Sequence, residues 1–466
     1  KQSLYQDWKD GNITHSDYRH MGADYEQQIE TAMAVIDSLK AERDKLENGI
    51  DEETNVLVRD GLVVAVGTDI ELPEKLLVKD CTGKYLVPGM VDVHVHFRDP
   101  GQEYKEDIIT GMRAAAHGGF TGVVPMANTN PVIDTGAMVE YLLEKGAWEP
   151  GRTRIYPLGA CTKGLAGKEL AEMGDMVAAG AVAFSDDGHG IQDGGMMRQV
   201  LDYAKMFDAP VLSHCQMEDI VGAGVVNEGV VSTRLGLAGW PAAGEETQIM
   251  RDIELARLTG CHVHIQHLTT ARAVDMVARA KAEGVPVTCE VTPHHLFLNE
   301  DDIKADNYDT NLKMNPPLRT KEDNLALQEA LIDGRIDMVA TDHAPHAAHE
   351  KALEFNRAPF GTTGLETALG LLLTELVLPG KMSWQRLVEV TSIAPRNLIG
   401  VEQVELREGS TADYTIIDPA LDWVVEADDF YSRSKNSAFL GWKLTGRPTD
   451  VFVDGYASME DGVVTF

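Results

Sequence analysis

Two histidines separated by one residue lie near the end of a short apolar segment, where both could bind the same metal ion. Apolar and polar residues alternate from Val91 to Phe97, which is the pattern of a strand buried on one side. His94 and His96 therefore share a face with Asp92, and their Cα atoms should lie roughly 7 Å apart. Asp99-Pro100-Gly101 is a turn sequence, so the two histidines are expected at the C-terminal end of the strand.

Other strand-like segments are also followed by residues that commonly bind metals or polar substrates. They are Asn128 after the second segment, Asp186 and Asp187 after the fourth, His214 after the fifth, His267 after the sixth, and Asp342, His343 and His346 after the eighth. Histidine and carboxylate ligands without thiolates suit zinc, manganese or iron, and zinc is the default choice. Arg98 follows the histidine pair, and its planar guanidinium could bind a substrate carboxylate in a bidentate manner. A surface salt bridge is the alternative for Arg98.

The elements that must position these residues alternate between strand-like and helix-like segments. Strands are expected at 91–97, 121–126, 154–158, 181–185, 210–213, 262–266, 285–291 and 337–341, and helices at 105–117, 136–145, 196–207, 245–259, 271–282 and 322–331. Eight such units predict an α/β fold, a (β/α)8 TIM-type barrel, with an open doubly wound sheet as the alternative. In a barrel the C-terminal ends of the strands share one mouth, so the polar residues would converge there.

The regions flanking the barrel have different patterns. Residues 1–47 contain apolar residues at heptad spacing and predict a helical coiled coil, with one long helix packed on its own domain as the alternative. Residues 48–87 and 400–466 contain short strands and turns, and we expect them to form a small β-sandwich-like domain built from both sides of the barrel. The barrel itself is assigned to residues 88–399.

Composition excludes several classes of function. The chain has 466 residues and a formal charge of −33, whereas binding to nucleic acid or to an anionic membrane requires basic patches. No secretion signal and no apolar run of about 18 residues is present, so the cytoplasm is the expected location. The five cysteines are scattered without C-x-x-C spacing, which favours reduced, buried thiols.

From about residue 48 to residue 466 the sequence resembles the type I dihydroorotases of the amidohydrolase superfamily. The resemblance rests on motifs that occur in the same order along the chain. They are His94-x-His96-Phe97-Arg98-Asp99-Pro100-Gly101, Asn128-Thr129-x-Pro131, Phe184-Ser185-Asp186-Asp187-Gly188, Thr292-Pro293-His294-His295, Lys313-Met314-Asn315-Pro316-Pro317-Leu318-Arg319, Thr341-Asp342-His343-Ala344-Pro345-His346 and Ala358-Pro359-Phe360-Gly361.

The resemblance implies a site with two zinc ions and a pocket for a small acidic ring. His94, His96 and Asp342 would bind one ion, His214 and His267 the other, and Asp187 would bridge them, with Asp186 as the second choice for the bridge. Arg98, Asn128 and His346 would bind the substrate carboxylate, and Asn315 with the backbone of Pro359, Phe360 and Gly361 would hold the ring. Without the motifs, Asn128 and Asn315 could equally be turn residues.

Two features depart from the family pattern. Ala127 stands where the family has proline, and Gln216 where it has glutamate, but neither change removes a ligand. Upstream of residue 48 the family has a strand, whereas residues 1–47 resemble the coiled-coil arm of large serine recombinases. We therefore expect a natural or engineered fusion near residues 47–50, self-association through the coil, and a β domain that lacks one edge strand.

The predicted metal site together with the resemblance implies a metal-dependent cyclic amidohydrolase that interconverts L-dihydroorotate plus water and N-carbamoyl-L-aspartate, a step of pyrimidine biosynthesis. Asp342 would act as general acid and base by moving a proton to the leaving nitrogen. The alternatives are an allantoinase, a dihydropyrimidinase-like cyclic amidase, and a non-catalytic barrel that carries the fused coil. A homodimer or larger homo-oligomer is expected, and aspartate transcarbamoylase is a candidate partner.

Overall fold

The structure is a computed structural model that describes residues 54–70, 73, 77–147, 149 and 151–466. The chain divides into two units, residues 1–54 and 55–466, and the account below concerns the second unit. The coiled coil predicted for residues 1–47 lies outside the described residues.

Eight short parallel strand segments form the barrel. They are β4 (Met90–Val95), β5 (Phe120–Pro125), β6 with β7 (Arg154–Ile155 and Leu158–Gly159), β8 (Ala183–Phe184), β9 (Val211–Ser213), β12 (Val263–Ile265), β13 (Val287–Val291) and β14 (Met338–Val339). Neighbouring strands pair in parallel from β4 to β6 and from β7 to β14. A parallel bridge between Val95 and His343 links the eighth segment to the first. The predicted parallel eight-strand arrangement is therefore confirmed.

The third expected strand, 154–158, is divided into two pieces that pair with different neighbours. β6 pairs with β5, and β7 pairs with β8. Pro157 lies between the two pieces and has no N–H to donate to a ladder. The strand therefore changes partner at the proline instead of continuing as one ladder.

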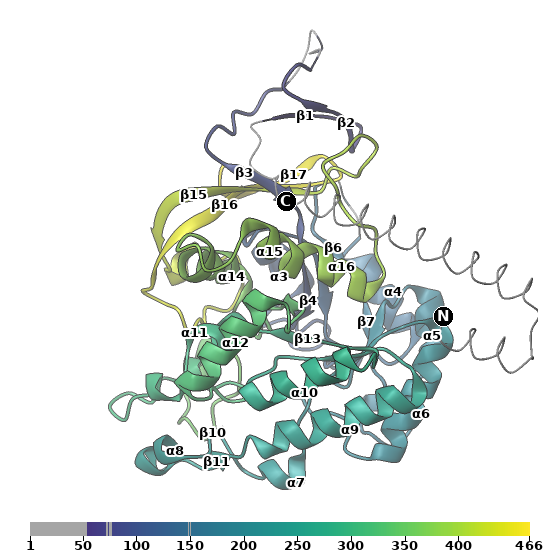
Figure 1. Cartoon of the computed structure of the whole chain (residues 1–466), viewed down its shortest axis with the longest axis vertical. Coiled ribbons are helices and arrows are strands. Elements are labelled where there is room, and N and C mark those ends of the chain that lie inside the picture. The colour runs from purple at the N-terminus through teal and green to yellow at the C-terminus, as the bar shows by residue number, and fades with distance from the viewer. Residues whose placement is uncertain (1–53, 71–72, 74–76, 148, 150) are drawn as a thin grey trace, which may run out of the picture. The chain divides into compact units, whose positions relative to one another are not determined.

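The helices between the strands surround the barrel. They are α3 (Ile108–His117), α4 (Gly136–Lys145), α5 (Met173–Ala179), α6 (Gly194–Ala204), α9 (Ala243–Thr259), α10 (Ala271–Ala282), α12 (Lys321–Asp333) and α14 (Leu365–Leu372). Figure 1 shows α9, α10 and α12 side by side across the near face of the barrel. All six predicted helices are present, and the capping side chains Asp107, Asp193, Thr270 and Thr320 accept hydrogen bonds at four of their N-termini.

Two barrel helices were not predicted from the sequence. α5 is only seven residues long, and α14 is buried along most of its surface. A helix buried on most sides has no polar face, so its sequence lacks the periodicity that predicts a helix. None of the described helices combines the length and apolar character needed to cross a bilayer.

Further short elements lie in the connections. The helices are α7 (Glu218–Val221), α8 (Val230–Leu235), α11 (Pro293–Phe297), α13 (Ala348–Lys351), α15 (Trp384–Val388) and α16 (Ala394–Ile399); β10 (Val226–Asn227) pairs with β11 (Gly239–Trp240). The 3-10 turns are η1 (Lys163–Leu165), η2 (Lys205–Phe207), η3 (Glu300–Asp302), η4 (Thr310–Leu312) and η7 (Ala427–Asp429), and π-helical turns are η5 (Leu373–Val377) and η6 (Glu389–Ile393).

A five-stranded antiparallel sheet combines segments from before and after the barrel. Its order is β18 (Val463–Val464), β17 (Tyr456–Glu460), β16 (Lys443–Val453), β15 (Tyr414–Val424) and β3 (Tyr85–Pro88). In Figure 1, β15 and β16 lie beside α14, which contacts β16. The sheet built from both sides of the barrel agrees with the expectation for this region.

A hairpin precedes this sheet in the chain. It consists of β1 (Asn55–Arg59) and β2 (Leu62–Gly67), which are joined by Asp60 and Gly61. Both loop residues have positive φ, 51° and 79°, as a type I′ turn requires. Val63 packs with Val404, Ala412 and Tyr414, so the hairpin is joined to the C-terminal part of the chain through a small apolar cluster.

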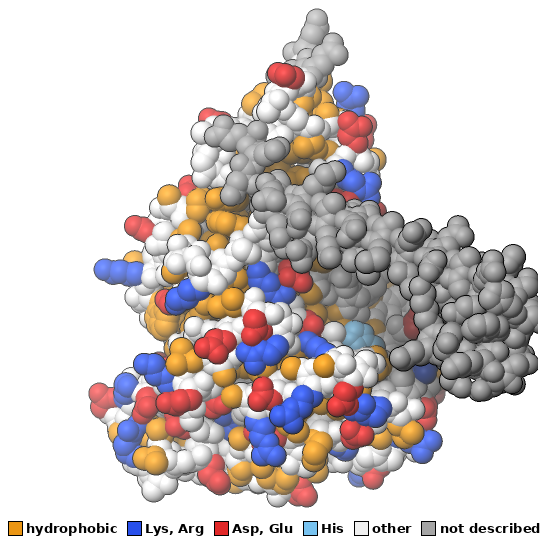
Figure 2. All heavy atoms as spheres, viewed as in Figure 1, with side chains coloured by type: hydrophobic (Ala, Val, Ile, Leu, Met, Phe, Trp, Pro, Cys, Tyr) orange, Lys and Arg blue, Asp and Glu red, His pale blue; other side chains and the backbone are white. Residues whose placement is uncertain are grey.

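The barrel core is apolar, and its charged surface is mixed. Every residue of β4 is buried, and Val91, Val93 and Val95 belong to the main core cluster. Their alternation with Asp92 and His94 places the apolar and polar side chains on opposite faces of the strand. On the face seen in Figure 2, acidic and basic side chains of the described residues are interspersed, and these residues form no continuous basic surface there.

Candidate active site

The ends of β4 and β14 bring the first three predicted ligands together. His96 Nε2 lies 3.0 Å from Asp342 Oδ1, and His94 Nε2 lies 3.6 Å from the same oxygen. All three side chains are buried. The backbone supports this arrangement because the Asp92 carboxylate accepts from the N–H of His94 at 3.0 Å and of Thr341 at 3.2 Å. Asp92 therefore ties the strand that carries the histidine pair to the strand that carries Asp342.

Asp187 occupies the centre of the predicted ligand set. Its Oδ1 lies 3.4 Å from His94 Nε2 and 3.3 Å from His214 Nδ1, and its Oδ2 lies 3.5 Å from His96 Nε2. His214 Nδ1 in turn lies 2.9 Å from His267 Nε2. The ligand atoms form two groups, and within each group they all lie within 4.8 Å of one another. One group is His94, His96 and Asp187, and the other is Asp187, His214 and His267. Asp187 is common to both groups.

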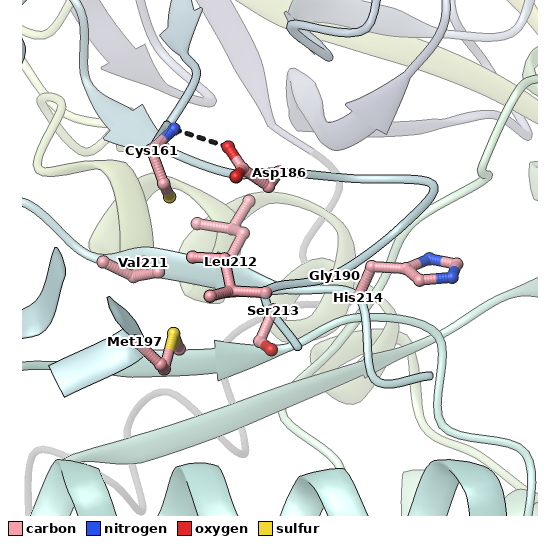
Figure 3. Close-up of a pocket in the computed structure, with 9 residues that line it drawn as sticks. Cys161, Asp186, Gly190, Met197, Val211, Leu212, Ser213 and His214 are labelled. Atoms are coloured by element: carbon pink, nitrogen blue, oxygen red, sulfur yellow. Dashed lines mark hydrogen bonds between the residues drawn. The ribbon is translucent and has the colours of Figure 1, made fainter. Parts of the chain in front are cut away.

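Asp186, the second choice for the bridge, faces a different environment. Its carboxylate accepts from the backbone N–H of Cys161 at 2.8 Å and of Thr162 at 3.0 Å, and from the Thr162 hydroxyl. Figure 3 shows Asp186 directed toward Cys161, with the ring of His214 turned away from both. Asp186 lines a small pocket together with Met197, His214 and residues of β9. Its contacts therefore hold the loop and do not face the two ligand groups.

The unpaired atoms and the chemistry of the cluster fit a bound divalent metal. Within the described part of the chain, the buried atoms His94 Nε2 and Asp187 Oδ1 have no hydrogen-bond partner. Imidazole nitrogens and carboxylate oxygens are typical zinc ligands. Buried polar atoms without partners are costly, so a cation between them would satisfy both.

The pKa shifts within the cluster also favour a bound cation. Burial acts to raise the pKa of Asp187, but His94 and His214 outweigh it and hold that pKa well below the ordinary value. Burial acts to lower the pKa of His94, and the carboxylates of Asp187, Asp342 and Glu290 raise it well above normal. Burial, followed by the charges of His214 and His94, lowers the pKa of His267 to about 3. The surrounding carboxylates therefore favour a positive charge at this position.

The residues predicted to bind the substrate carboxylate lie at different positions around this cluster. Arg98 Nη2 lies 3.4 Å from His346 Nε2, which donates to the carbonyl of Phe360 at 2.7 Å. Asn128 instead contacts the ligand set, because its Oδ1 lies 3.0 Å from His96 Nδ1 and its Nδ2 donates to Asp187 at 3.1 Å. The structure therefore brings Arg98 and His346 together and places Asn128 against the proposed metal ligands.

Hydrogen bonds from other parts of the chain hold the backbone of the predicted ring-binding segment. Lys351 Nζ donates to the carbonyl of Pro359 at 3.0 Å, and the N–H of Gly361 donates to the carbonyl of Lys313 at 2.8 Å. Lys313 Nζ lies 4.4 Å from the centre of the Phe360 ring. Gly361 has a φ of +118°, and a Cβ there would lie 2.5 Å from the Cβ of Ala344. The segment therefore has a fixed course that only glycine allows at position 361.

Asn315 is the remaining predicted residue, and it approaches the site from another connection. Its Nδ2 donates to Gln216 Oε1 at 3.2 Å, and the same oxygen accepts from His214 Nε2 at 3.0 Å. Gln216, which departs from the family pattern, thus joins Asn315 to a proposed ligand. The buried Oδ1 of Asn315 has no hydrogen-bond partner among the described residues.

One residue near the site was not found from the sequence. Glu290 lies in β13, and its carboxylate contacts His94 and His264. The segment Val287–Val291 alternates apolar and polar residues, so Thr288 and Glu290 share one face. This alternation was the signal that could have identified Glu290, because it places a carboxylate on the inward face of a barrel strand. Glu290 was missed because the prediction considered residues at or after the ends of strands, and Glu290 lies within β13.

Solved structures with the same arrangement define the class of fold. The chain is similar to an L-hydantoinase (dihydropyrimidinase) from Arthrobacter aurescens, with a TM-score of 0.79, 29% identity, and coverage of 89% of this chain and 94% of that one. A D-hydantoinase (dihydropyrimidinase) from Thermus sp. has a TM-score of 0.76 and 27% identity over 89% of this chain and 94% of that one. The fold is thus that of the hydantoinase-like α/β barrels of the amidohydrolases.

Sequence comparisons identify the family within this class. A family model described as "Dihydro-orotase-like" matches residues 83–273. A dihydroorotase of Geobacter metallireducens is 46% identical over 87% of this chain and 95% of its own length, and a dihydroorotase of Syntrophotalea carbinolica is 47% identical over 88% and 95%. The chain belongs to the dihydroorotase family.

Proposed function

We propose that the protein is a metal-dependent dihydroorotase, which interconverts L-dihydroorotate plus water and N-carbamoyl-L-aspartate. The observation that carries the proposal is the position of Asp187 between two groups of histidines, His94 with His96 and His214 with His267. The membership of the chain in the dihydroorotase family supports the choice of substrate.

The proposed cofactor is a pair of zinc ions. His94, His96 and Asp342 would hold one ion, His214 and His267 the other, and Asp187 would bridge them. When bound, zinc would lower the pKa of water and polarise the amide carbonyl of the substrate. This assignment accounts for the unpaired atoms His94 Nε2 and Asp187 Oδ1.

Asp342 is proposed to move the proton during the reaction. Ring opening adds water to the amide carbon, breaks the carbon–nitrogen bond and places one proton on the leaving nitrogen. Burial acts to raise the pKa of Asp342, but His94 and His96 lower it below its ordinary value, so the group begins as a carboxylate that can accept a proton. In the reverse direction the same group would take the proton from the carbamoyl nitrogen.

Arg98 is proposed to bind the carboxylate of the substrate. Its side chain donates from Nε to the carbonyl of Pro345 at 3.3 Å, which fixes the guanidinium beside His346. Burial and the neighbouring cation of Arg98 lower the pKa of His346 far below normal, so Arg98 supplies the positive charge. Asn315 and the backbone of residues 359–361 are proposed to hold the ring, and Asn128 is retained as a third proposed contact to the carboxylate.

An assay with three cyclic amides tests the function. Purified protein loaded with zinc should open dihydroorotate and close carbamoyl-aspartate, with much lower rates on hydantoin and allantoin. Similarity to the two hydantoinase structures favours a dihydropyrimidinase-like amidase as the second candidate. Faster turnover of hydantoin than of dihydroorotate would reject our assignment in favour of that candidate. Absence of turnover on every cyclic amide would support a non-catalytic carrier.

Self-association of the chain through its N-terminal segment is proposed from the sequence alone. Residues 1–47 would form a coiled coil like that of large serine recombinases, appended to a β domain (48–87 and 400–466) and a barrel (88–399). Removal of residues 1–47 should reduce the oligomer size and leave turnover unchanged, which light scattering and a dihydroorotate assay would measure. An unchanged oligomer would exclude self-association through this segment. Aspartate transcarbamoylase remains the candidate partner, and the cytoplasm the proposed location.

A further inference from the structure

One buried carboxylate contacts both groups of the proposed metal centre. Glu290 Oε1 lies 2.7 Å from His94 Nδ1 and accepts from the backbone N–H of His267 at 3.3 Å. Its other oxygen lies 3.0 Å from His264 Nε2. Glu290, His94 and His264 are all fully buried, so water does not compete for these bonds.

The contacts of Glu290 restrict the ring of His94 to one form. A carboxylate can only accept hydrogen bonds, so Nδ1 of His94 must carry the proton and donate it to Glu290. Nε2 is then left with its lone pair, and this atom lies 3.4 Å from Asp187 and 3.6 Å from Asp342. A neutral histidine can bind a metal only through the nitrogen that lacks a proton.

The same carboxylate also fixes the backbone of the second group. His267 has a positive φ of 34°, which is unfavourable for a residue with a Cβ and needs support from its surroundings. Its N–H donates to Glu290, and its ring contacts His214 at 2.9 Å. A shift of this backbone would therefore move His267 relative to His214.

Glu290 is itself held by a chain of polar groups that runs from the buried His264 to the half-buried Thr288 and His262. His264 Nδ1 lies 2.8 Å from the Thr288 hydroxyl, and His262 Nε2 lies 2.8 Å from the same oxygen. His264 lies in β12, His262 directly precedes that strand, and Thr288 lies in β13, which pairs with β12 in parallel. The carboxylate is thus supported from the barrel interior, on the side opposite to the mouth.

We propose that Glu290 is a positioning residue that sets both halves of the metal centre, by fixing the tautomer of His94 and the backbone of His267. This inference rests on the proposed metal-dependent function. Outer partners of metal-binding histidines typically change metal affinity by about 10- to 100-fold when they are removed.

Two substitutions of Glu290 separate this role from a general contribution to folding. Glu290→Met removes both acceptors and keeps a similar volume, whereas Glu290→Gln retains one oxygen that can accept from His94. Asp413→Asn is the matched control, because Asp413 is also buried and accepts from the N–H of Asp454 at 2.7 Å in the β domain. The metal-free variants are compared by circular dichroism and thermal unfolding before metal is added.

Zinc affinity is the primary measurement and does not depend on the substrate. Competition with a chromogenic chelator should show a loss of about 10- to 100-fold in Glu290→Met, a smaller loss in Glu290→Gln, and wild-type affinity in Asp413→Asn. The visible spectrum of the cobalt-loaded protein should change in the Glu290 variants alone, because the ligand geometry changes. With dihydroorotate, kcat should fall more than KM rises.

Wild-type zinc affinity and an unchanged cobalt spectrum in Glu290→Gln and Glu290→Met would overturn the proposal. If Glu290→Met does not fold, the Glu290→Gln variant gives the same comparison on its own. Failure of the proposed function has a different signature. Wild-type protein that binds zinc but does not open dihydroorotate would reject the substrate, whereas the effect of Glu290 on zinc affinity would still be measured.

Discussion

Asp186 and Asp187 are consecutive residues whose carboxylates contact separate sets of partners. Asp186 accepts from the backbone of Cys161 and Thr162, and Asp187 lies within 3.5 Å of three histidine rings. The loop after β8 therefore uses one carboxylate to fix its own course and presents the next one to the barrel mouth.

We expect Asp187→Asn to lose zinc and at least about 100-fold in kcat, because a neutral amide cannot replace the shared carboxylate. Asp186→Asn should keep two zinc ions per chain and lose stability, by about 1–3 kcal/mol, because the Cys161 and Thr162 donors lose a charged acceptor. Metal analysis and thermal unfolding of both variants measure these effects. The reverse result, zinc loss in Asp186→Asn alone, would make Asp186 the bridge.

Substitution of Asn128 can distinguish two roles for this residue, which are holding the metal ligands and binding the substrate carboxylate. Its hydrogen bonds to His96 and Asp187 predict that Asn128→Ala loses zinc affinity. Direct binding of the substrate carboxylate predicts a higher KM with unchanged zinc affinity. We expect the first effect to dominate, by roughly 10-fold in zinc affinity, as for other residues that hold metal ligands. Chelator competition and steady-state kinetics on the same preparation decide between the two.

Arg98→Lys should reduce kcat/KM for dihydroorotate by roughly 10- to 100-fold, since a lost charged hydrogen bond is worth about 1.5–3 kcal/mol. Lysine keeps the charge but cannot form a planar bidentate pair with a carboxylate. Arg272→Lys is a suitable control, because Arg272 is exposed and pairs with the carboxylate of Glu246. Equal kinetics for Arg98→Lys and wild type would remove Arg98 from the substrate pocket.

The stability of the fold should depend on pH through Lys351, which is buried beneath Pro359. Burial, and next the charge of Lys313, lowers the pKa of Lys351 to about 7. An unfolded lysine has a pKa of about 10.4, so between about pH 7 and 10.4 the unfolded chain binds the additional proton. The free energy of unfolding contributed by this residue therefore rises with pH in that window, and below about pH 7 its contribution no longer changes.

Urea unfolding at pH 7 and pH 9 measures this contribution. The unfolding midpoint of wild type should increase more between the two pH values than that of Lys351→Met. Lys381→Met, a change at an exposed lysine, should behave as wild type does. An identical pH response in Lys351→Met would show that Lys351 remains charged in the folded protein.

Much of the barrel follows from sequence pattern alone. The alternation in 91–97 predicted a strand with histidines on one face, and the pattern of residues 48–87 predicted short strands and turns; both features are present. Local patterns suffice for these strands and turns because the conformation of each one is determined mainly by its own residues. The division of the third strand at Pro157 depends on which neighbours accept its backbone, and a local pattern does not contain that information.

The site was predicted less completely than the fold. Residues that follow strands could be placed at one mouth because parallel strands align their ends. The orientation of each side chain could not be predicted, which is why the sequence left Asp186 and Asp187 as alternatives and gave Asn128 no contact with Asp187. Glu290 was missed because its partners His94 and His264 are 196 and 26 residues away along the chain.

The pairing of β3 with β15 has a consequence for how the molecule tolerates cleavage of its backbone. Pro88 pairs with Tyr414 and Tyr85 with Ile417, so the two flanks of the barrel are joined to each other by a ladder outside it. A single backbone cut by a protease in an exposed barrel loop would leave two fragments that still share this ladder and the barrel core. We expect such a nicked protein to migrate as one species in a native gel and as two in a denaturing gel.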